Sequence, residues 1–131
     1  MSQAEQTEAK WDVQLRKGSL ELVILAALKE RELYGLELLN LLHSLETMQI
    51  TEGTLYPLMD RLKRDGVVAA EWQQEGDARP RKYYKLTKSG ADKLKSLTMR
   101  WRKSVGDIEF LIINPGPEPL DDALQNRMEE Q

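Results

Sequence analysis

The stretch that most constrains this chain is residues 51–66, whose side chains repeat with the period of an α-helix until the pattern stops at Gly66. At about 100° per residue, four apolar side chains fall on one stripe of such a helix. They are Leu55, Leu58, Met59 and Leu62. Thr51 is expected to cap the first turn with its hydroxyl, and Gly66 to end the helix in the left-handed conformation. The stretch therefore predicts a short helix that lies on a core with one face.

The opposite face of this helix carries groups that suit contact with DNA. It presents Gly53, Tyr56, Pro57, Asp60, Arg61 and Arg64. A helix with such groups outward fits the major groove. An ordinary surface helix with a solvated face explains the same pattern. Asp60 disfavours the DNA-binding interpretation because phosphate repels its carboxylate. It could instead pair with Arg64 four residues later and hold that side chain in place. The helix alone leaves both interpretations open.

After Gly66 the repeat of the side chains changes to two, the pattern of β-strands. Residues 67–73 and 79–86 predict two strands joined by a turn at residues 75–78. The tip and returning strand of this hairpin carry Arg79, Arg81 and Lys82. A basic hairpin behind an outward-facing helix is typical of a winged helix-turn-helix, in which the helix enters the major groove and the wing contacts phosphates. The two elements together favour DNA binding over an inert soluble surface.

The distribution of charge supports this interpretation although the net charge is −3. Residues 53–104 hold 13 Lys and Arg residues against 6 Asp and Glu residues, whereas the rest of the chain holds 6 against 16. An anionic partner responds to the local field more than to the total charge. Chance segregation together with an acidic tail remains an alternative explanation.

Two apolar stretches before residue 51 predict the first two helices of the domain. Ser19 is expected to cap a helix that ends near residues 30–31 and buries Leu22, Val23, Leu25, Ala26 and Ala27. A second helix is expected from Tyr34 to about Leu45, with Leu36, Leu38, Leu39 and Leu42 inward. His43 is the single histidine, and one histidine cannot build a zinc site, so it is expected to be structural.

A long last helix is expected at residues 88–113, capped by Thr87. Its apolar residues are spaced by three or four, close to a coiled-coil seam. They are Leu94, Leu97, Trp101, Val105, Ile108 and Ile112. We expect this helix to pair with its copy in a homodimer, together with Trp11 and Leu15 of a short helix at residues 9–16. The alternative is that both helices fold onto the core of their own chain.

These elements predict a mainly α fold with a small β-hairpin: a winged helix-turn-helix plus a long C-terminal dimerisation helix. The expected organisation is an N-terminal segment at 1–17, the DNA-binding domain at 18–87, the dimerisation helix at 88–113 and an acidic, flexible tail at 114–131. Cysteine is absent, and no glycine-rich phosphate loop, metal-spaced cluster or nucleophile–base pair occurs, so no enzyme, cofactor or metal is expected. The longest apolar run, residues 22–28, is too short to cross a membrane, and a cytoplasmic protein is expected.

Three segments together resemble the PadR family of bacterial transcriptional regulators. They are GTLYPLMDRLKRDGVV at residues 53–68, EW at 71–72 and RPRKYYKLTKSG at 79–90. Tyr34 and Gly35 also fit, and the similarity extends over about residues 19–101. The single C-terminal helix is similar to the smaller PadR subfamily. The resemblance implies a homodimeric repressor that binds a palindromic operator in double-stranded DNA and releases it when a small molecule binds.

The resemblance also implies roles for individual residues. Family DNA contacts correspond to Thr54, Tyr56, Pro57 and the wing cations. The whole set of expected DNA contacts is Thr51, Gly53, Thr54, Tyr56, Pro57, Arg61, Arg64, Arg79, Arg81 and Lys82. Trp101 stands where multidrug-sensing relatives stack a flat aromatic ligand, although a tryptophan on a dimer seam also serves as plain core. A winged-helix module that docks another protein is the alternative function.

Overall fold

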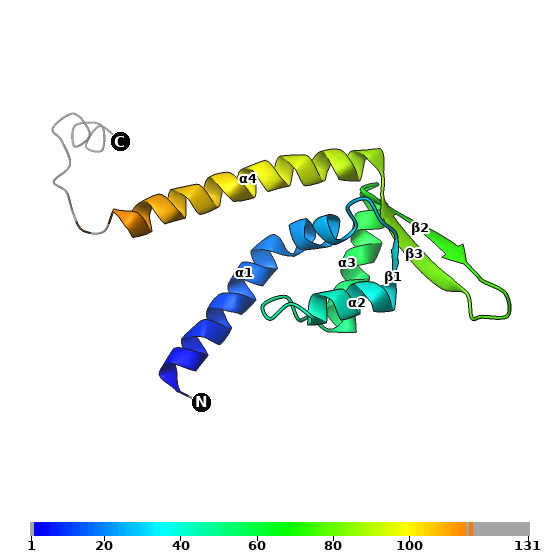
Figure 1. Cartoon of the computed structure of the whole chain (residues 1–131), viewed down its shortest axis with the longest axis horizontal. Coiled ribbons are helices and arrows are strands. Elements are labelled where there is room, and N and C mark those ends of the chain that lie inside the picture. Colours follow the sequence, from blue (N-terminus) through cyan, green and yellow to red (C-terminus); the bar gives the residue numbers. More distant parts are fainter. Residues whose placement is uncertain (1, 115, 117–131) are drawn as a thin grey trace. The chain divides into compact units, whose positions relative to one another are not determined.

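The computed structural model describes residues 2–114 and 116. The elements run α1 (Gln3–Ala27), β1 (Leu33–Tyr34), α2 (Gly35–His43), α3 (Glu52–Arg64), β2 (Val68–Gln73), β3 (Arg81–Leu86) and α4 (Lys88–Ile113) (Figure 1). The chain forms two compact units, one ending at Thr98 and the other starting at Met99, so that α4 belongs partly to each. The predicted class, mainly helical with a small antiparallel sheet, is confirmed.

The N-terminal region is one continuous helix, and the prediction of two helices was wrong. Ser2 caps α1: its hydroxyl accepts from the Glu5 backbone N–H at 3.1 Å. Ser19, the expected cap of the second helix, lies inside α1 and donates to the Leu15 carbonyl at 2.7 Å. A Gly–Ser pair lowers the stability of a helix but removes no backbone N–H donor. The helix therefore continues through this pair, because the residues on both sides favour helical structure. The expected boundary between residues 17 and 18 therefore falls within α1.

The first two helices bury most of the predicted residues. Leu25 and Ala27 of α1 are buried, and Leu22 and Val23 are partly buried against the core. Ala26 is exposed, contrary to prediction. The α1 helix ends at Ala27, a few residues before the expected end.

The second helix begins one residue later than expected and ends at His43. Leu38, Leu39 and Leu42 are buried as predicted, whereas Leu36 is 50% exposed. Leu36 lies in the first turn of α2. The imidazole Nε2 of His43 is 2.6 Å from the Ile50 carbonyl oxygen, in agreement with a structural role.

The third helix has the predicted stripe. Leu55, Met59 and Leu62 are buried, and Leu58 is partly buried against the same core. Gly66 has a φ of 77°, which confirms the left-handed end of this segment. Thr51 occupies the N-cap position, but its hydroxyl does not cap the backbone and lies instead 3.3 Å from the Thr54 hydroxyl. That detail of the prediction was wrong.

The sheet has three strands in the order β1-β3-β2, one more than the predicted hairpin. The β2–β3 register runs from Val68 opposite Leu86 to Gln73 opposite Arg81, and the hairpin projects away from the helices (Figure 1). The two-residue strand β1 pairs with the other edge of β3. Two residues are too short to show a period of two, which is why the sequence pattern missed this strand.

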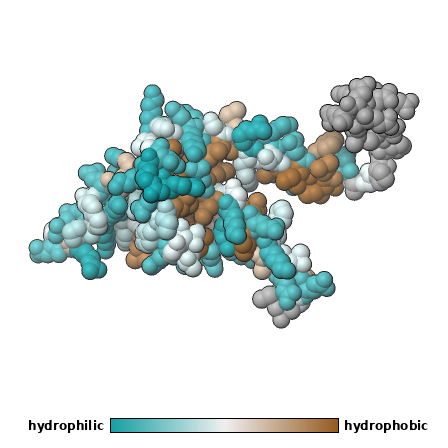
Figure 2. All heavy atoms as spheres, turned by 180° about the vertical axis from the view of Figure 1, so that it is seen from behind, coloured by the Kyte–Doolittle hydropathy of each residue, from teal (hydrophilic) through white to brown (hydrophobic). Residues whose placement is uncertain are grey.

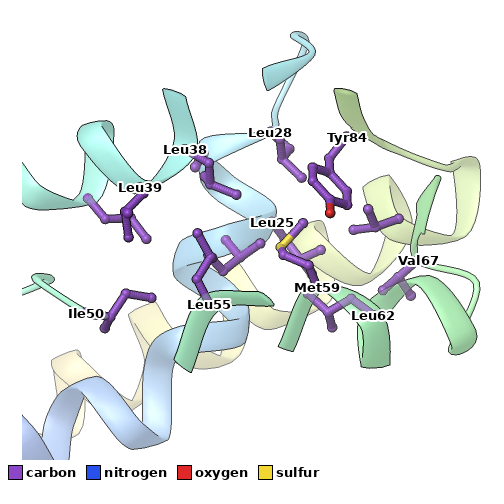
Figure 3. Packing of buried hydrophobic residues seen from close by; sticks show 14 of the residues in the cluster. Leu25, Leu28, Leu38, Leu39, Ile50, Leu55, Met59, Leu62, Val67 and Tyr84 are labelled. Atoms are coloured by element: carbon purple, nitrogen blue, oxygen red, sulfur yellow. The ribbon is translucent and has the colours of Figure 1, made fainter. Parts of the chain in front are cut away.

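The core of the first unit draws residues from α1, α2, α3, the sheet and the start of α4. Figure 3 shows Leu25, Leu38, Leu55, Met59 and Tyr84 converging from these elements. Leu94 of α4 joins the same cluster at 7% exposure. The core therefore fixes the position of α3 relative to the start of the β2–β3 hairpin, which is the wing.

The start of α4 is tied to the turn that follows α3. Thr87 caps the helix as predicted, since its hydroxyl oxygen accepts from the Gly90 N–H at 3.0 Å. The same hydroxyl donates to the Gly66 carbonyl at 2.6 Å. The helix ends at Ile113, as expected. The acidic tail expected at residues 114–131 lies outside the described residues, except for positions 114 and 116.

None of the helices in the described part of the chain is long and apolar enough to cross a membrane.

Candidate nucleic-acid interface

The outer face of α3 is exposed along its length. Of the expected contact residues, Thr51, Gly53, Thr54, Tyr56, Pro57, Arg61 and Arg64 are all exposed. Pro57 lies inside the helix and has no backbone N–H, so it cannot donate to the Gly53 carbonyl four residues earlier. This face therefore offers a hydroxyl pair at its start, a tyrosine ring, two guanidinium groups and a Gly53 carbonyl that receives no hydrogen bond from position 57.

Two cations of the wing, Arg81 and Lys82, are oriented by aromatic rings. The guanidinium carbon of Arg81 lies 4.5 Å from the centre of the Tyr34 ring. The ammonium nitrogen of Lys82 lies 5.7 Å from the centre of the Tyr84 ring. Arg79 is exposed next to Pro80, in the loop before β3. Cations over ring faces lose some of their conformational freedom while keeping their charge available to an anion.

An open hollow lies between α3 and the wing and brings residues of both together. Its volume is roughly 430 Å³, and we call it the helix–wing hollow. It is lined by Tyr34, Gly35, Leu36, Tyr56, Asp60, Trp72, Arg81, Lys82 and Tyr84. Tyr56 of the helix thus shares one surface with Arg81 and Lys82 of the wing. Arg61, Arg64 and Arg79 do not line it.

Arg61 has a different environment from the other predicted contacts. Its Nη2 atom is 3.9 Å from the Oε1 atom of Glu21 in α1, and its side chain is 53% exposed. The same carboxylate oxygen accepts from Lys93 Nζ of α4 at 2.9 Å. Part of the charge of Arg61 is therefore compensated within the chain. No ion pair joins Asp60 to Arg64 in residues 2–114, so the pairing considered for Asp60 was wrong.

Asp60 instead lines the helix–wing hollow and affects Tyr84. Burial, followed by the charges of Asp60 and Tyr56, raises the pKa of the Tyr84 hydroxyl above its usual value of 10.0. Tyr84 lines the hollow and is also a core residue with 4% exposure. Its side chain therefore connects the hollow with the hydrophobic core. Asp60 lowers the positive potential that Arg81 and Lys82 create at this site.

The shifted pKa of Tyr84 predicts a loss of stability in alkali. The unfolded chain releases this proton near pH 10 and the folded chain only at a higher pH, so the contribution is complete below about pH 10 and is lost as the pH rises further. Tyr84→Phe should weaken the fall in free energy of unfolding between pH 9 and pH 11. Urea titrations of both proteins across this range measure it, and the comparison at pH 7 isolates the effect of removing the hydroxyl itself. Equal pH dependence of the two proteins would contradict the prediction.

Six lining residues were not among the predicted contacts: Tyr34, Gly35, Leu36, Asp60, Trp72 and Tyr84. Trp72 is 67% exposed on β2, unusual for so large an aromatic side chain. Its place on a predicted strand and the match of Tyr34 and Gly35 to the family pattern were visible in the sequence. That Tyr34, Gly35 and Trp72 line the same hollow was not visible, because it depends on how β1 pairs with β3.

The second half of α4 leaves large apolar side chains in solvent. Trp101 is 47% exposed, Ile108 51% and Ile112 62%. Figure 2 shows apolar residues gathered at the end of this helix, beside the grey atoms. Met99, Phe110, Leu111 and Ile113 are exposed as well. In α1, Trp11 and Leu15 are 57% and 43% exposed. By contrast, Leu94 and Leu97 of the predicted seam pack on the core of their own chain.

No group of three or more histidine, cysteine, aspartate or glutamate residues suited to a metal ion occurs in the described ranges.

The helices and the sheet define a winged helix-turn-helix protein with an exposed, cationic α3–wing surface. The model of the transcriptional regulator PadR-like family matches residues 24–96, and the chain belongs to this family. An uncharacterised protein of Lysinibacillus sphaericus is 32% identical over 87 residues, which cover 65% of this chain and 80% of that protein.

Solved structures have the same fold. A PadR family regulator from Eggerthella lenta superposes with a TM-score of 0.74 at 31% identity, covering 86% of this chain and 97% of that chain. Bacillus subtilis PadR, solved in complex with operator DNA, gives a TM-score of 0.58 at 21% identity, covering 85% of this chain and 57% of that chain.

Proposed function

We propose that this chain is a sequence-specific DNA-binding regulator that grips duplex DNA with α3 and the wing together. The observation that carries the proposal is the helix–wing hollow, where Tyr56 of α3 meets Arg81 and Lys82 of β3. The fold is shared with Bacillus subtilis PadR, which was solved bound to operator DNA. In the proposed complex, α3 lies in the major groove and the wing cations neutralise phosphates and release counterions.

The predicted contacts divide into three groups by chemistry. Hydroxyls of Thr51, Thr54 and Tyr56 hydrogen-bond phosphates or base edges and set the register of the helix. Gly53 and Pro57 have no hydrogen-bonding side chain, and the missing side chain of Gly53 lets the backbone approach the DNA closely. The cations Arg61, Arg64, Arg79, Arg81 and Lys82 supply the electrostatic part of the affinity, and Arg61 contributes least because Glu21 already faces it.

We also propose that the protein acts as a homodimer of the smaller PadR subfamily. The exposed residues Trp101, Ile108 and Ile112 support this, since monomers rarely leave so many large apolar side chains in water. Val105 completes this stripe, and Trp11 and Leu15 of α1 add a second apolar surface. A two-fold dimer presents two α3 helices to a palindromic operator.

In this scheme residues 18–87 bind DNA, residues 88–113 dimerise with help from residues 1–17, and residues 114–131 form an acidic tail. Occupancy of the operator blocks transcription in the cytoplasm. Release follows when a small aromatic effector binds at Trp101 and favours a dimer whose two α3 helices no longer match the half-sites. Such a ligand can shift the dimer only by the difference in its affinity for the two forms.

A footprint of the purified protein on the DNA upstream of its own gene tests the function. We expect two protected half-sites about one helical turn apart, and a strong loss of protection between 50 and 200 mM salt as counterion release requires. A scrambled duplex of equal length is the control for sequence specificity. Equal binding to both duplexes, or affinity unchanged over that salt range, would contradict the proposal.

The effector site is tested with Trp101 as the single fluorophore. In a Trp11→Phe, Trp72→Phe background, a planar aromatic dye that stacks on the Trp101 indole should quench its fluorescence by about half or more at saturation. Calorimetry should then show that Trp101→Ala in the unmodified background lowers dye affinity by about tenfold, the loss expected for one aromatic stacking contact. Unchanged affinity in Trp101→Ala would place the dye elsewhere and leave Trp101 as interface core.

A further inference from the structure

Gly35, the first residue of α2, is in direct contact with the Tyr56 ring of α3. A Cβ atom built on Gly35 would lie 2.7 Å from both Cε1 and Oη of Tyr56 and 3.1 Å from Cζ. These distances are shorter than carbon atoms tolerate, so the ring occupies the space that any side chain at position 35 would need. Gly35 has ordinary helical backbone geometry, so the reason for glycine here is this close approach.

The contact fixes the outer half of the Tyr56 side chain. Within residues 2–114 the Tyr56 hydroxyl has no intramolecular hydrogen bond, and Tyr56 is 36% exposed at the helix–wing hollow. A tyrosine ring has only two side-chain torsions, so packing along one side of it sets where the hydroxyl points. The backbone of Gly35 supplies that packing, which leaves the hydroxyl free to bind a group from outside.

We propose that Gly35 is a positioning residue for the contact of Tyr56 with DNA, an inference that rests on the proposed function. A methyl group at position 35 would push the ring away from α2. A displacement of the hydroxyl by about 1 Å takes a hydrogen bond to a phosphate beyond its useful range. Gly35 would then influence DNA affinity without touching DNA.

Gly35→Ala is expected to affect folding stability and DNA affinity in opposite directions, which makes the inference testable. Alanine favours a helix more than glycine does. The atoms in the way belong to the far end of a flexible side chain, so the ring can move at little cost to the fold. Gly35→Ala should therefore keep or raise the Tm while it weakens DNA binding. Gly18→Ala in α1 is the matched control, because a Cβ there meets nothing within 4 Å.

The experiment combines DNA affinity with a direct observation of Tyr56. Fluorescence anisotropy on the footprinted duplex measures affinity for the unmodified protein, Gly35→Ala, Tyr56→Ala and the double variant. Fluorine NMR of protein labelled with 3-fluorotyrosine, assigned with Tyr56→Phe, reports the position of the ring without DNA. We expect Gly35→Ala to shift the Tyr56 resonance and to weaken binding by roughly tenfold per half-site. In the Tyr56→Ala background the same change should alter affinity by less than about twofold.

The possible failures are distinguishable. If Gly35→Ala weakens binding equally in both backgrounds, or not at all, the positioning role is overturned while the proposed function stands. If the unmodified protein binds no duplex, the proposed function is wrong, and the proposed role of Gly35 in DNA binding is wrong as well. A shifted Tyr56 resonance would in that case still show the Gly35–Tyr56 contact.

Discussion

Gly90→Ala is expected to lower the free energy of unfolding by about 3 kcal/mol or more and the Tm by more than about 10 °C. Gly90 lies in the first turn of α4, where an added Cβ would overlap the Val67 carbonyl oxygen and lie 2.9 Å from the carbonyl carbon. The obstructing atoms are backbone and cannot rotate away as a side chain can. Hydrogen bonds of the Thr87 N–H to the Val67 carbonyl and of the Thr87 hydroxyl to the Gly66 carbonyl prevent α4 from lifting freely.

Gly106→Ala in the same helix is the matched control for this prediction. A Cβ at position 106 meets nothing within 4 Å, and the residue lies away from the predicted dimer seam. Alanine there should stabilise the helix by about 0.5–1 kcal/mol. Thermal and urea unfolding of the three proteins measure both effects. Comparable stability of Gly90→Ala and the unmodified chain would show that the first turn of α4 does not need its close contact with Val67.

Neutralising the wing cations Arg79, Arg81 and Lys82 is expected to weaken operator binding by at least about 100-fold at 100 mM salt. The change is Arg79→Ala, Arg81→Ala and Lys82→Ala together, which removes the cations held over Tyr34 and Tyr84 and the exposed Arg79. Each lost phosphate contact also removes about 0.9 from the slope of log affinity against log salt, so the slope should fall by about 3 or more. Anisotropy titrations at four salt concentrations measure affinity and slope together.

The control for the wing variant removes the same charge elsewhere. Lys10→Ala, Lys17→Ala and Lys29→Ala take three exposed cations from α1 and the turn after it. We expect DNA affinity to fall by less than about fivefold and the salt slope to stay unchanged, because the position of the charges affects binding more than the total charge does. An equal loss of DNA affinity in both triple variants would show that the wing cations act only through the total charge of the protein. The circular dichroism of both should match the unmodified protein.

Local patterns in the sequence predicted the elements that carry the candidate site. The stripe of Leu55, Met59 and Leu62, the left-handed Gly66 and the cap at Thr87 follow from side-chain periods and backbone preferences that involve only near neighbours. The hairpin was visible for the same reason. The break expected at Gly18 was wrong because helix formation there is decided by neighbours on both sides rather than by one weak residue.

The sequence by itself determined the fold class, the family and the exposed cationic face, since each follows from repeats over adjacent turns or from contiguous motifs. Only the tertiary structure decided that β1 pairs with β3, that Glu21 joins Arg61 to Lys93, and that Gly35 supports Tyr56. These contacts join residues far apart in the chain. No local period encodes such distant partners, because they depend on how whole helices and strands pack to bury a shared core.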